Sequence, residues 1–294
     1  MFGRYLERLR QACPVIHTIT NYVTANDAAN MLLAAGARPV MAEDPEEVAE
    51  ITARCDGLTL NLGTLRTGVI PAMLAAGQQA ALLHHPIVLD PVGAGSSRLR
   101  TETARQLVSA LSPTVIRGKM SEILAIAGKE SHIRGVDAAD SDTVTGNTLP
   151  ERADTLLNLS EQLGVILSVT GPIDLVTDGK RCLMIWNGRP EMGRVTGTGC
   201  QLSALTAAFL AANPEDPLEA AAAAVCLMGV AGETGWKRMQ PGDGNIAYRG
   251  YIIDAVYNMT GQMLEKGENV ELFTRESAAV CSDRPKLAQG RISG

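Results

Sequence analysis

The chain has 294 residues, a formal net charge of −6 at pH 7, 46% hydrophobic residues and only 3% aromatic residues. It is long enough to bury a large core, as one α/β domain or as two smaller domains, and that core must consist mainly of aliphatic side chains. Because the basic residues are scattered, the sequence shows no concentration of positive charge that would bind a nucleic-acid backbone, and we expect no nucleic-acid partner. The sequence has neither a run of about 18 apolar residues nor a signal-peptide pattern, so we expect a cytoplasmic protein without membrane contact.

Strand patterns alternate with helix patterns along the first half of the chain. Residues 87–89 are consecutively apolar, as in a fully buried parallel strand, whereas Asp44, Pro45 and Glu47 together form a helix start signal. The expected strands are 15–19, 39–41, 58–62, 87–89, 114–117 and 165–170. The expected helices are 2–12, 24–35, 44–54, 71–83, 103–111, 121–127 and 153–163. Such repeated units predict a layered α/β fold with a mainly parallel central sheet and helices on both faces.

The second half of the chain predicts an antiparallel hairpin and three further helices. Residues 175–177 and 182–186 flank Asp178-Gly179-Lys180, which is typical of a hairpin turn. The helices are expected at 200–212, 218–234 and 251–266, and the polar stretch 128–149 is expected to be a long loop. Apolar periodicity ends near Thr274. We therefore expect a single domain over 1–273 and a flexible tail over 274–294.

A glycine-rich turn at the start of the helix 200–212 is the strongest candidate for a chemical site. Gly197, Thr198, Gly199 and Cys200 place converging backbone N–H groups at a helix N-terminus, which predicts an anion hole suited to phosphate. Such a position is expected to lower the pKa of the thiol from about 8.5 toward neutrality, so that it could accept a proton from a hydroxyl. The alternative is a small buried cysteine without a chemical role.

Charged residues at other expected strand ends form a second candidate group. Asp90 follows a strand and precedes Gly93 and Gly95, and a carboxylate there could hold Mg²⁺ directly or through water. Glu122 adds a second acid, and Arg117 could neutralise a triphosphate. The alternatives are a turn cap for Asp90, a first-turn helix carboxylate for Glu122 and a surface ion pair for Arg117.

The cysteines and histidines show no metal-ligand spacing. The six cysteines form no Cys-x-x-Cys pair, which predicts reduced thiols without a disulfide frame or a zinc site. For the four histidines, His17, His84, His85 and His132, we expect solvated or structural roles.

Six blocks of the sequence, in the same order, are similar to hydroxyethylthiazole kinases of thiamine salvage, members of the ribokinase-like superfamily. The blocks are His17-Thr18-Ile19-Thr20-Asn21-Tyr22-Val23, Pro39-Val40-Met41-Ala42, Leu60-Asn61-Leu62-Gly63-Thr64-Leu65, Asp90-Pro91-Val92-Gly93-Ala94-Gly95, Ile116-Arg117-Gly118 and Val195-Thr196-Gly197-Thr198-Gly199-Cys200. The resemblance runs from about Val15 to Lys266. It implies a ribokinase-like layered fold and ATP-dependent phosphorylation of the primary alcohol of 4-methyl-5-(2-hydroxyethyl)thiazole, with Mg²⁺.

The resemblance also implies roles for particular residues. Asn21, Met41 and Gly197 would bind the thiazole, Arg117 and Thr170 would contact ATP, and Asp90 and Glu122 would serve the metal ion. Cys200 would stand where most ribokinase-like relatives carry a catalytic aspartate. The assembly implied is a homotrimer with active sites between subunits.

Two positions depart from the family pattern. Lys119 stands where relatives commonly have the Asn of an Asn-x-x-Glu element, which alters the surroundings of Glu122 and offers a direct phosphate contact. Thr198 stands where Ala is usual, a mild change in a loop that works through its backbone.

Three other functions remain open at this point. The first is a related kinase that acts on a pyrimidine or pyridoxine alcohol. The second is a lyase such as the nicotinamide-hydrate dehydratases of the superfamily, against which the absence of Asp at position 200 counts. The third is a non-catalytic nucleotide-binding regulator, which only Lys119 favours.

Overall fold

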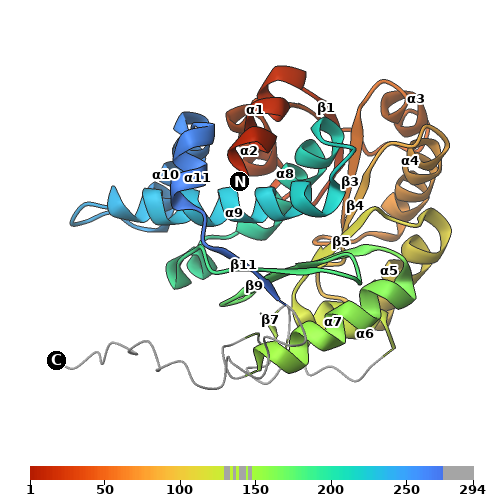
Figure 1. Ribbon diagram of the computed structural model, residues 1–294. Helices are drawn as coiled ribbons and strands as arrows, with labels where there is room; N and C mark the ends of the chain where they lie inside the picture. Colours follow the sequence, from red (N-terminus) through yellow and green to blue (C-terminus); the bar gives the residue numbers. More distant parts are fainter. Residues whose placement is uncertain (129–132, 135–136, 139–143, 145–147, 274–294) are drawn as a thin grey trace.

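A nine-stranded sheet forms the centre of the computed structural model, which describes residues 1–128, 133–134, 137–138, 144 and 148–273 (Figure 1). In spatial order its strands are β11 (Val270–Phe273), β10 (Cys182–Ile185), β9 (Asp174–Thr177), β8 (Ile166–Val169), β5 (Val115–Gly118), β4 (Ile87–Asp90), β3 (Gly57–Asn61), β1 (Val15–Ile19) and β2 (Arg38–Val40). The six strands from β8 to β2 are parallel, and β9, β10 and β11 continue the sheet by antiparallel pairing. The prediction of a mainly parallel sheet is confirmed.

Helices cover both faces of this sheet (Figure 1). On one face lie α1 (Gly3–Ala12), α2 (Ala25–Ala35), α8 (Thr198–Ala212) and α9 (Pro217–Lys237), joined by α10 (Asn245–Asn258) and α11 (Gly261–Gly267). On the other lie α3 (Val48–Thr52), α4 (Ile70–Leu82), α5 (Arg98–Leu111), α6 (Met120–Ile126) and α7 (Leu149–Leu163). Short 3₁₀ helices at Thr67–Val69 and Pro190–Arg194 and the strand pair β6 (Ile133–Arg134) and β7 (Asp137–Ala138) complete the described elements.

Each face of the sheet contributes to its own hydrophobic core. In β4, Val88 points into the core beneath α8 and α9, while Ile87 and Leu89 point into the core beneath α4 and α5. This two-sided burial explains why the strand reads as a continuous apolar run, because successive side chains of a strand point to opposite faces.

Helix α9 is long and apolar enough to span a membrane, by length and composition alone. Most of its apolar window (83%) is buried within the fold, where α9 packs against α8, α10 and the sheet. It is built as a core helix, which explains the concentration of Ala and Met that the sequence shows there.

Two helix predictions are wrong in their bounds. Asp44 does not cap a helix: its carboxylate accepts the N–H of Glu46 at 2.9 Å in a turn, and α3 begins only at Val48. The expected helix 251–266 is two helices, because Met259 adopts an extended conformation and the Thr260 hydroxyl caps α11 by accepting the N–H of Met263 at 3.1 Å. A local side-chain hydrogen bond overrides the helical pattern in both places.

Other differences concern the ends of predicted segments. Helix α7 begins at Leu149, four residues before the expected start, and strand β11 was not predicted. Most of the predicted loop 128–149 and the whole predicted tail 274–294 lie outside the described residues. His17 has the expected structural role, since it is fully buried and its ring nitrogens contact Thr52 Oγ1 and the Ala42 carbonyl.

Candidate active site

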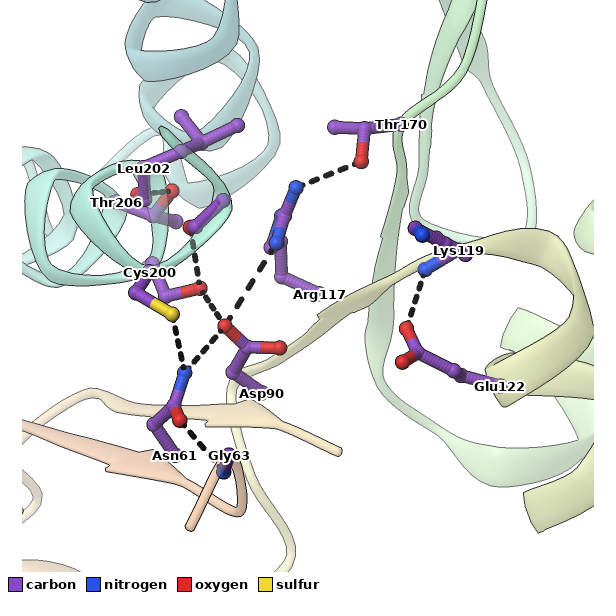
Figure 2. A network of polar contacts seen from close by, with 12 residues as sticks. Asn61, Gly63, Asp90, Arg117, Lys119, Glu122, Thr170, Cys200, Leu202 and Thr206 are labelled. Carbon is purple, nitrogen blue, oxygen red and sulfur yellow. Dashed lines mark hydrogen bonds and ion pairs between the residues drawn. The ribbon is translucent and has the colours of Figure 1, made fainter. Parts of the chain in front are cut away.

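Polar side chains meet where three neighbouring parallel strands end. Asn61, Asp90 and Arg117 stand at or near the carboxyl ends of β3, β4 and β5, and Figure 2 shows them turned toward the first turn of α8. All three are at least nine-tenths buried. Ligands of open α/β sheets bind at this edge, so the arrangement is a candidate active site.

The first turn of α8 carries the glycine-rich loop that the sequence singled out. Gly197 is the N-cap residue with a φ of 90°, and a Cβ added there would lie 2.7 Å from Thr24 Cγ2. A Cβ added to Gly199 would lie 2.7 Å from Arg117 Nη1. A side chain at Gly197 would be strained by the backbone conformation, and a side chain at Gly199 would displace the Arg117 guanidinium.

Cys200 lies in this turn and contacts two amide side chains. Its Sγ accepts hydrogen bonds from Asn21 Nδ2 at 3.1 Å and from Asn61 Nδ2 at 3.3 Å. Burial and the neighbouring Asp90 carboxylate raise the pKa of the thiol, although hydrogen bonds from Thr24 and Asn21 act in the other direction. The predicted lowering of this pKa is thus wrong, because dehydration and a nearby negative charge outweigh the favourable position at a helix N-terminus.

Asp90 is held through one of its two carboxylate oxygens. Its Oδ2 accepts from Asn61 Nδ2 at 2.7 Å and from the Ser203 hydroxyl at 2.6 Å, and it lies 3.7 Å from Arg117 Nη1. Its Oδ1 is buried without a hydrogen-bond partner among the described residues. Burial raises the pKa of Asp90, opposed by Arg117 and the two donors. The unpartnered oxygen is a donor atom available to a ligand.

Glu122 is committed to the backbone. Its two oxygens accept the N–H groups of Gly93 and Lys119, each at 2.7 Å, so the carboxylate joins the loop after β4 to the start of α6. Burial and the Asp90 charge raise its pKa. Lys119 caps α6 through its backbone, so the departure from Asn leaves this arrangement intact.

Asp90 and Glu122 could hold a metal ion only together with oxygen atoms from bound phosphate and water. The described residues contain no group of three or more His, Cys, Asp or Glu side chains that could hold a metal. Asp90 offers a free oxygen, and Glu122 lies close enough for its pKa to respond to the Asp90 charge. One or two carboxylates completed by phosphate oxygens and water match the usual protein environment of Mg²⁺.

A cavity of about 520 Å³ opens beside the α8 turn. At one end lie Arg117, Lys119, Thr170, Thr198 and Gly199, where Arg117 Nη2 donates to Thr170 Oγ1 at 2.6 Å. The rest of the lining is largely apolar but also holds the charged side chains Asp174 and Arg189; its other members include Asn187, Gly188, Pro190, Met192, Val225, Met228 and Gly229. Cationic and apolar side chains in one cavity suit a nucleoside triphosphate.

The expected thiazole-binding residues lie partly at this site. Asn21 contacts Cys200, and Gly197 begins α8, so these two are brought together. Met41, by contrast, is 41% exposed and does not line the cavity. Tyr22 and Val23, which follow Asn21, are also exposed. Within one chain, the two residues that follow the Cys200 contact at Asn21 are therefore exposed to solvent.

The sequence did not point to three residues that contact the predicted site residues. Asn61 lies within a block that supported the family resemblance, but no role was assigned to it. Ser203 follows Cys200 by three residues, a spacing that places both on one face of α8. Thr24, which packs on Gly197, carried no sequence signal beyond a helix cap.

Comparison with known proteins identifies the family of the chain. The sequence profile of the Hydroxyethylthiazole kinase family matches residues 6–262. The hydroxyethylthiazole kinase of Clostridium acetobutylicum is 46% identical over 273 residues, which cover 93% of this chain and 100% of the relative.

Solved structures of a hydroxyethylthiazole kinase and of a ribokinase-like protein share the fold. The hydroxyethylthiazole kinase structure from Pyrococcus horikoshii OT3 is similar with a TM-score of 0.82 at 33% identity, covering 93% of this chain and 99% of that one. A ribokinase-like superfamily protein from Enterococcus faecalis V583 shares the fold, with a TM-score of 0.56 at 16% identity and coverage of 86% and 90%. The family profile, the curated relative and the solved structure agree, and the chain belongs to the hydroxyethylthiazole kinase family.

Proposed function

We propose that the chain transfers the γ-phosphoryl group of ATP to the primary alcohol of 4-methyl-5-(2-hydroxyethyl)thiazole, in thiamine salvage. The observation that carries this proposal is the α8 turn: Thr198 and Gly199 line the cavity, and Cys200 of the same turn contacts Asn21. An alcohol bound next to Asn21 and Cys200 would face a phosphoryl group held at the N-terminus of α8.

The cavity would bind the nucleotide. The base would lie against Met192 and Val225, and the phosphates would extend toward Arg117, Lys119 and Thr170. The backbone N–H groups of Gly197–Cys200 would hold the transferring phosphoryl group. Such positioning and charge neutralisation provide most of the catalysis in phosphoryl transfer, because the transition state is loose.

The fit of Asp90 and Glu122 to a metal ion supports Mg²⁺ as the partner of ATP. Asp90 would hold the ion through its free Oδ1, and Glu122 would support it while fixing the loop that contains Gly93. The ion would supply neutralisation of phosphate charge.

Cys200 would orient the alcohol as a neutral thiol. Because its pKa is raised, the group is protonated near pH 7, and its sulfur is fixed by Asn21 and Asn61. The alcohol oxygen would then attack phosphorus while the bond to the leaving ADP oxygen breaks, and the hydroxyl proton would pass late to an oxygen of the transferred phosphoryl group or to water. A strong base is not required for such a step.

The acceptor side is proposed to be completed by a second subunit. Tyr22 and Val23, which follow Asn21 in the sequence, are 75% and 57% exposed, and Met41 is 41% exposed. Exposed apolar side chains of this kind favour an interface. This exposure is consistent with a homotrimer that has its sites between subunits, and we expect that assembly to be cytoplasmic.

Coupled-enzyme measurement of ADP release tests the function directly. Purified protein with MgATP is given hydroxyethylthiazole, hydroxymethylpyrimidine, pyridoxine or no acceptor, and the product mass is determined. ADP release with a thiazole phosphate product only in the first reaction is expected. Phosphorylation of one of the other alcohols would reassign the acceptor, and ATP binding without any product would favour a regulator.

A further inference from the structure

Arg100, in the first turn of α5, joins the two loops that carry the site residues. Its Nη1 donates to the carbonyl oxygens of Leu62 and Val92, the latter at 2.7 Å, and its Nη2 donates to the Gly63 carbonyl at 2.7 Å. Leu62 and Gly63 follow β3, whereas Val92 follows β4. One rigid guanidinium therefore fixes the distance between the loop after Asn61 and the loop after Asp90.

The loop after β3 in turn decides which way the Asn61 amide faces. The Gly63 N–H donates to Asn61 Oδ1 at 2.8 Å, and Asn21 Nδ2 donates to the same oxygen at 3.0 Å. A backbone N–H can be satisfied only by the amide oxygen, so Asn61 Nδ2 must face Asp90 and Cys200. All four hydrogen-bonding positions of the Asn61 amide are occupied.

These loops are closely packed against their neighbours. A Cβ on Gly63 would lie 2.6 Å from Asn21 Nδ2, and a Cβ on Gly93 would lie 3.0 Å from Arg100 Cδ. The Gly93 N–H is also the donor that holds Glu122. A shift of either loop is therefore transmitted to the site, because close-packed groups have little room to absorb it.

We propose that Arg100 is a positioning residue for phosphoryl transfer, which acts through Asn61 to set the placement of the Cys200 thiol and the Asp90 carboxylate. Arg100 does not line the cavity, so its effect is on geometry and not on nucleotide binding. The inference rests on the proposed function for its kinetic readout, but the orientation of Cys200 can also be measured without substrate.

Arg105 provides a matched control on the same helix. It donates from Nε to the Ile126 carbonyl at 3.1 Å and from Nη2 to the Ala125 carbonyl at 2.6 Å, at the end of α6. Arg100→Met is expected to lower kcat by about 10- to 100-fold with little change in the KM for ATP, because small displacements of reacting groups cost about this much. Arg105→Met is expected to leave kcat nearly unchanged. An equal loss of kcat in both variants would overturn the proposal.

A double-mutant cycle tests the route through Asn61. In an Asn61→Ala background, Arg100→Met is expected to add little further loss of kcat, since the side chain that it positions is already absent. Independent, multiplying losses would contradict the proposal. Urea unfolding identifies variants that fail to fold; Arg100→Lys then replaces Arg100→Met, because one ammonium cannot span both loops.

The rate of Cys200 alkylation by iodoacetamide, followed by peptide mass, gives the substrate-free readout. Arg100→Met and Asn61→Ala should change this rate alike, and Arg105→Met should not. If the wild-type chain phosphorylates no alcohol but the alkylation pattern holds, the proposed function fails while the positioning role stands. If the chain is active and Arg100→Met leaves both kcat and alkylation unchanged, only the positioning role fails.

Discussion

At the scale of single residues, Cys200 is the side chain whose chemistry the fold changes most. Burial and Asp90 raise the pKa of its thiol, so the group is a neutral thiol at pH 7, and we propose that it orients the acceptor hydroxyl through a hydrogen bond. Cys200→Ala is expected to lower kcat by at least about tenfold without a matching change in KM, since the interaction is made mainly with the reacting group. Steady-state kinetics at saturating MgATP measure this.

Cys200→Ser separates orientation from proton abstraction. A serine hydroxyl keeps the hydrogen-bonding ability of the thiol but is a far weaker acid, so it should retain most of the activity if Cys200 only orients the alcohol. A serine variant as inactive as the alanine variant, together with a wild-type kcat that rises with pH up to the thiol pKa, would instead assign Cys200 as the base.

Asp174 gives a prediction about stability and pH. Burial raises the pKa of this carboxyl from 3.8 to about 7, while the Gly171 N–H at 2.8 Å and the Arg117 charge oppose the shift. Because this pKa is raised in the folded state, the Asp174 carboxyl makes its full contribution to the unfolding free energy below about pH 4. That contribution is lost as the pH rises through 7.

Asp174→Asn removes this titration while keeping an oxygen that accepts the Gly171 N–H. Relative to wild type, the variant should gain unfolding free energy as the pH rises from 5 to 8. Urea unfolding at several pH values tests this, and a difference between the two proteins that does not change with pH would exclude Asp174 as the titrating group.

At the scale of elements, the N-terminus of α8 depends on the left-handed backbone of Gly197 and on the close packing of Gly199 against Arg117. Gly199→Ala would place a Cβ 2.7 Å from Arg117 Nη1 and disturb the bond from Arg117 to Thr170. We expect on the order of a tenfold to 100-fold loss of kcat/KM for ATP, because charge neutralisation depends on exact placement.

Gly68→Ala is the control for this substitution. Gly68 is exposed, and a Cβ there would meet nothing within 4 Å, so the variant should keep wild-type kinetics. Nucleotide titration by calorimetry provides a second measurement for both variants. Unchanged ATP affinity and turnover in Gly199→Ala would show that Arg117 does not need its present position.

The elements also show where local sequence patterns decide structure and where they do not. The parallel strands were predicted because their apolar runs and the glycines that follow are local signals. The break at Met259 and the turn at Asp44 were missed, because in each a single side chain competes for a backbone N–H. Strand β11 was missed because its pairing partner, β10, is distant in the sequence.

At the scale of the whole molecule, the proposed homotrimer predicts a mass in solution of three times the 31.1 kDa chain. Ile246, at the start of α10, is 64% exposed, and Arg249 of the same helix lies 3.4 Å from Asp27 of α2. We expect the proposed interface to include Ile246, so Ile246→Glu should weaken the assembly by placing a charge among apolar side chains and thereby lower activity.

Leu82→Glu is the matched control, since Leu82 is 72% exposed on α4, on the opposite face of the sheet. It should leave both mass and activity unchanged. Analytical ultracentrifugation with parallel kinetics provides the measurement. A wild-type protein that is active as a monomer would contradict the proposal that the site is completed by a second subunit.

The sequence by itself determined the family, through six motif blocks, and the mainly parallel sheet and the α8 turn, because glycines and apolar runs are local features. The order of the strands within the sheet was decided only by the tertiary structure. The sequence also led to Asp90, Arg117 and Cys200, since each follows a recognisable strand or glycine signal. The single domain over 1–273 remains a prediction at its boundary, because 274–294 lie outside the described residues.

Only the tertiary structure decided how the site residues are held and charged. Asn61 faces Cys200 because Gly63 fixes its amide, and Gly63 is fixed by Arg100, which is 37 residues away in the sequence. The raised pKa of Cys200 likewise depends on burial and on Asp90, neither of which is encoded in the neighbouring residues. Orientation and pKa are properties of the surrounding groups, and those groups meet only when the chain has folded.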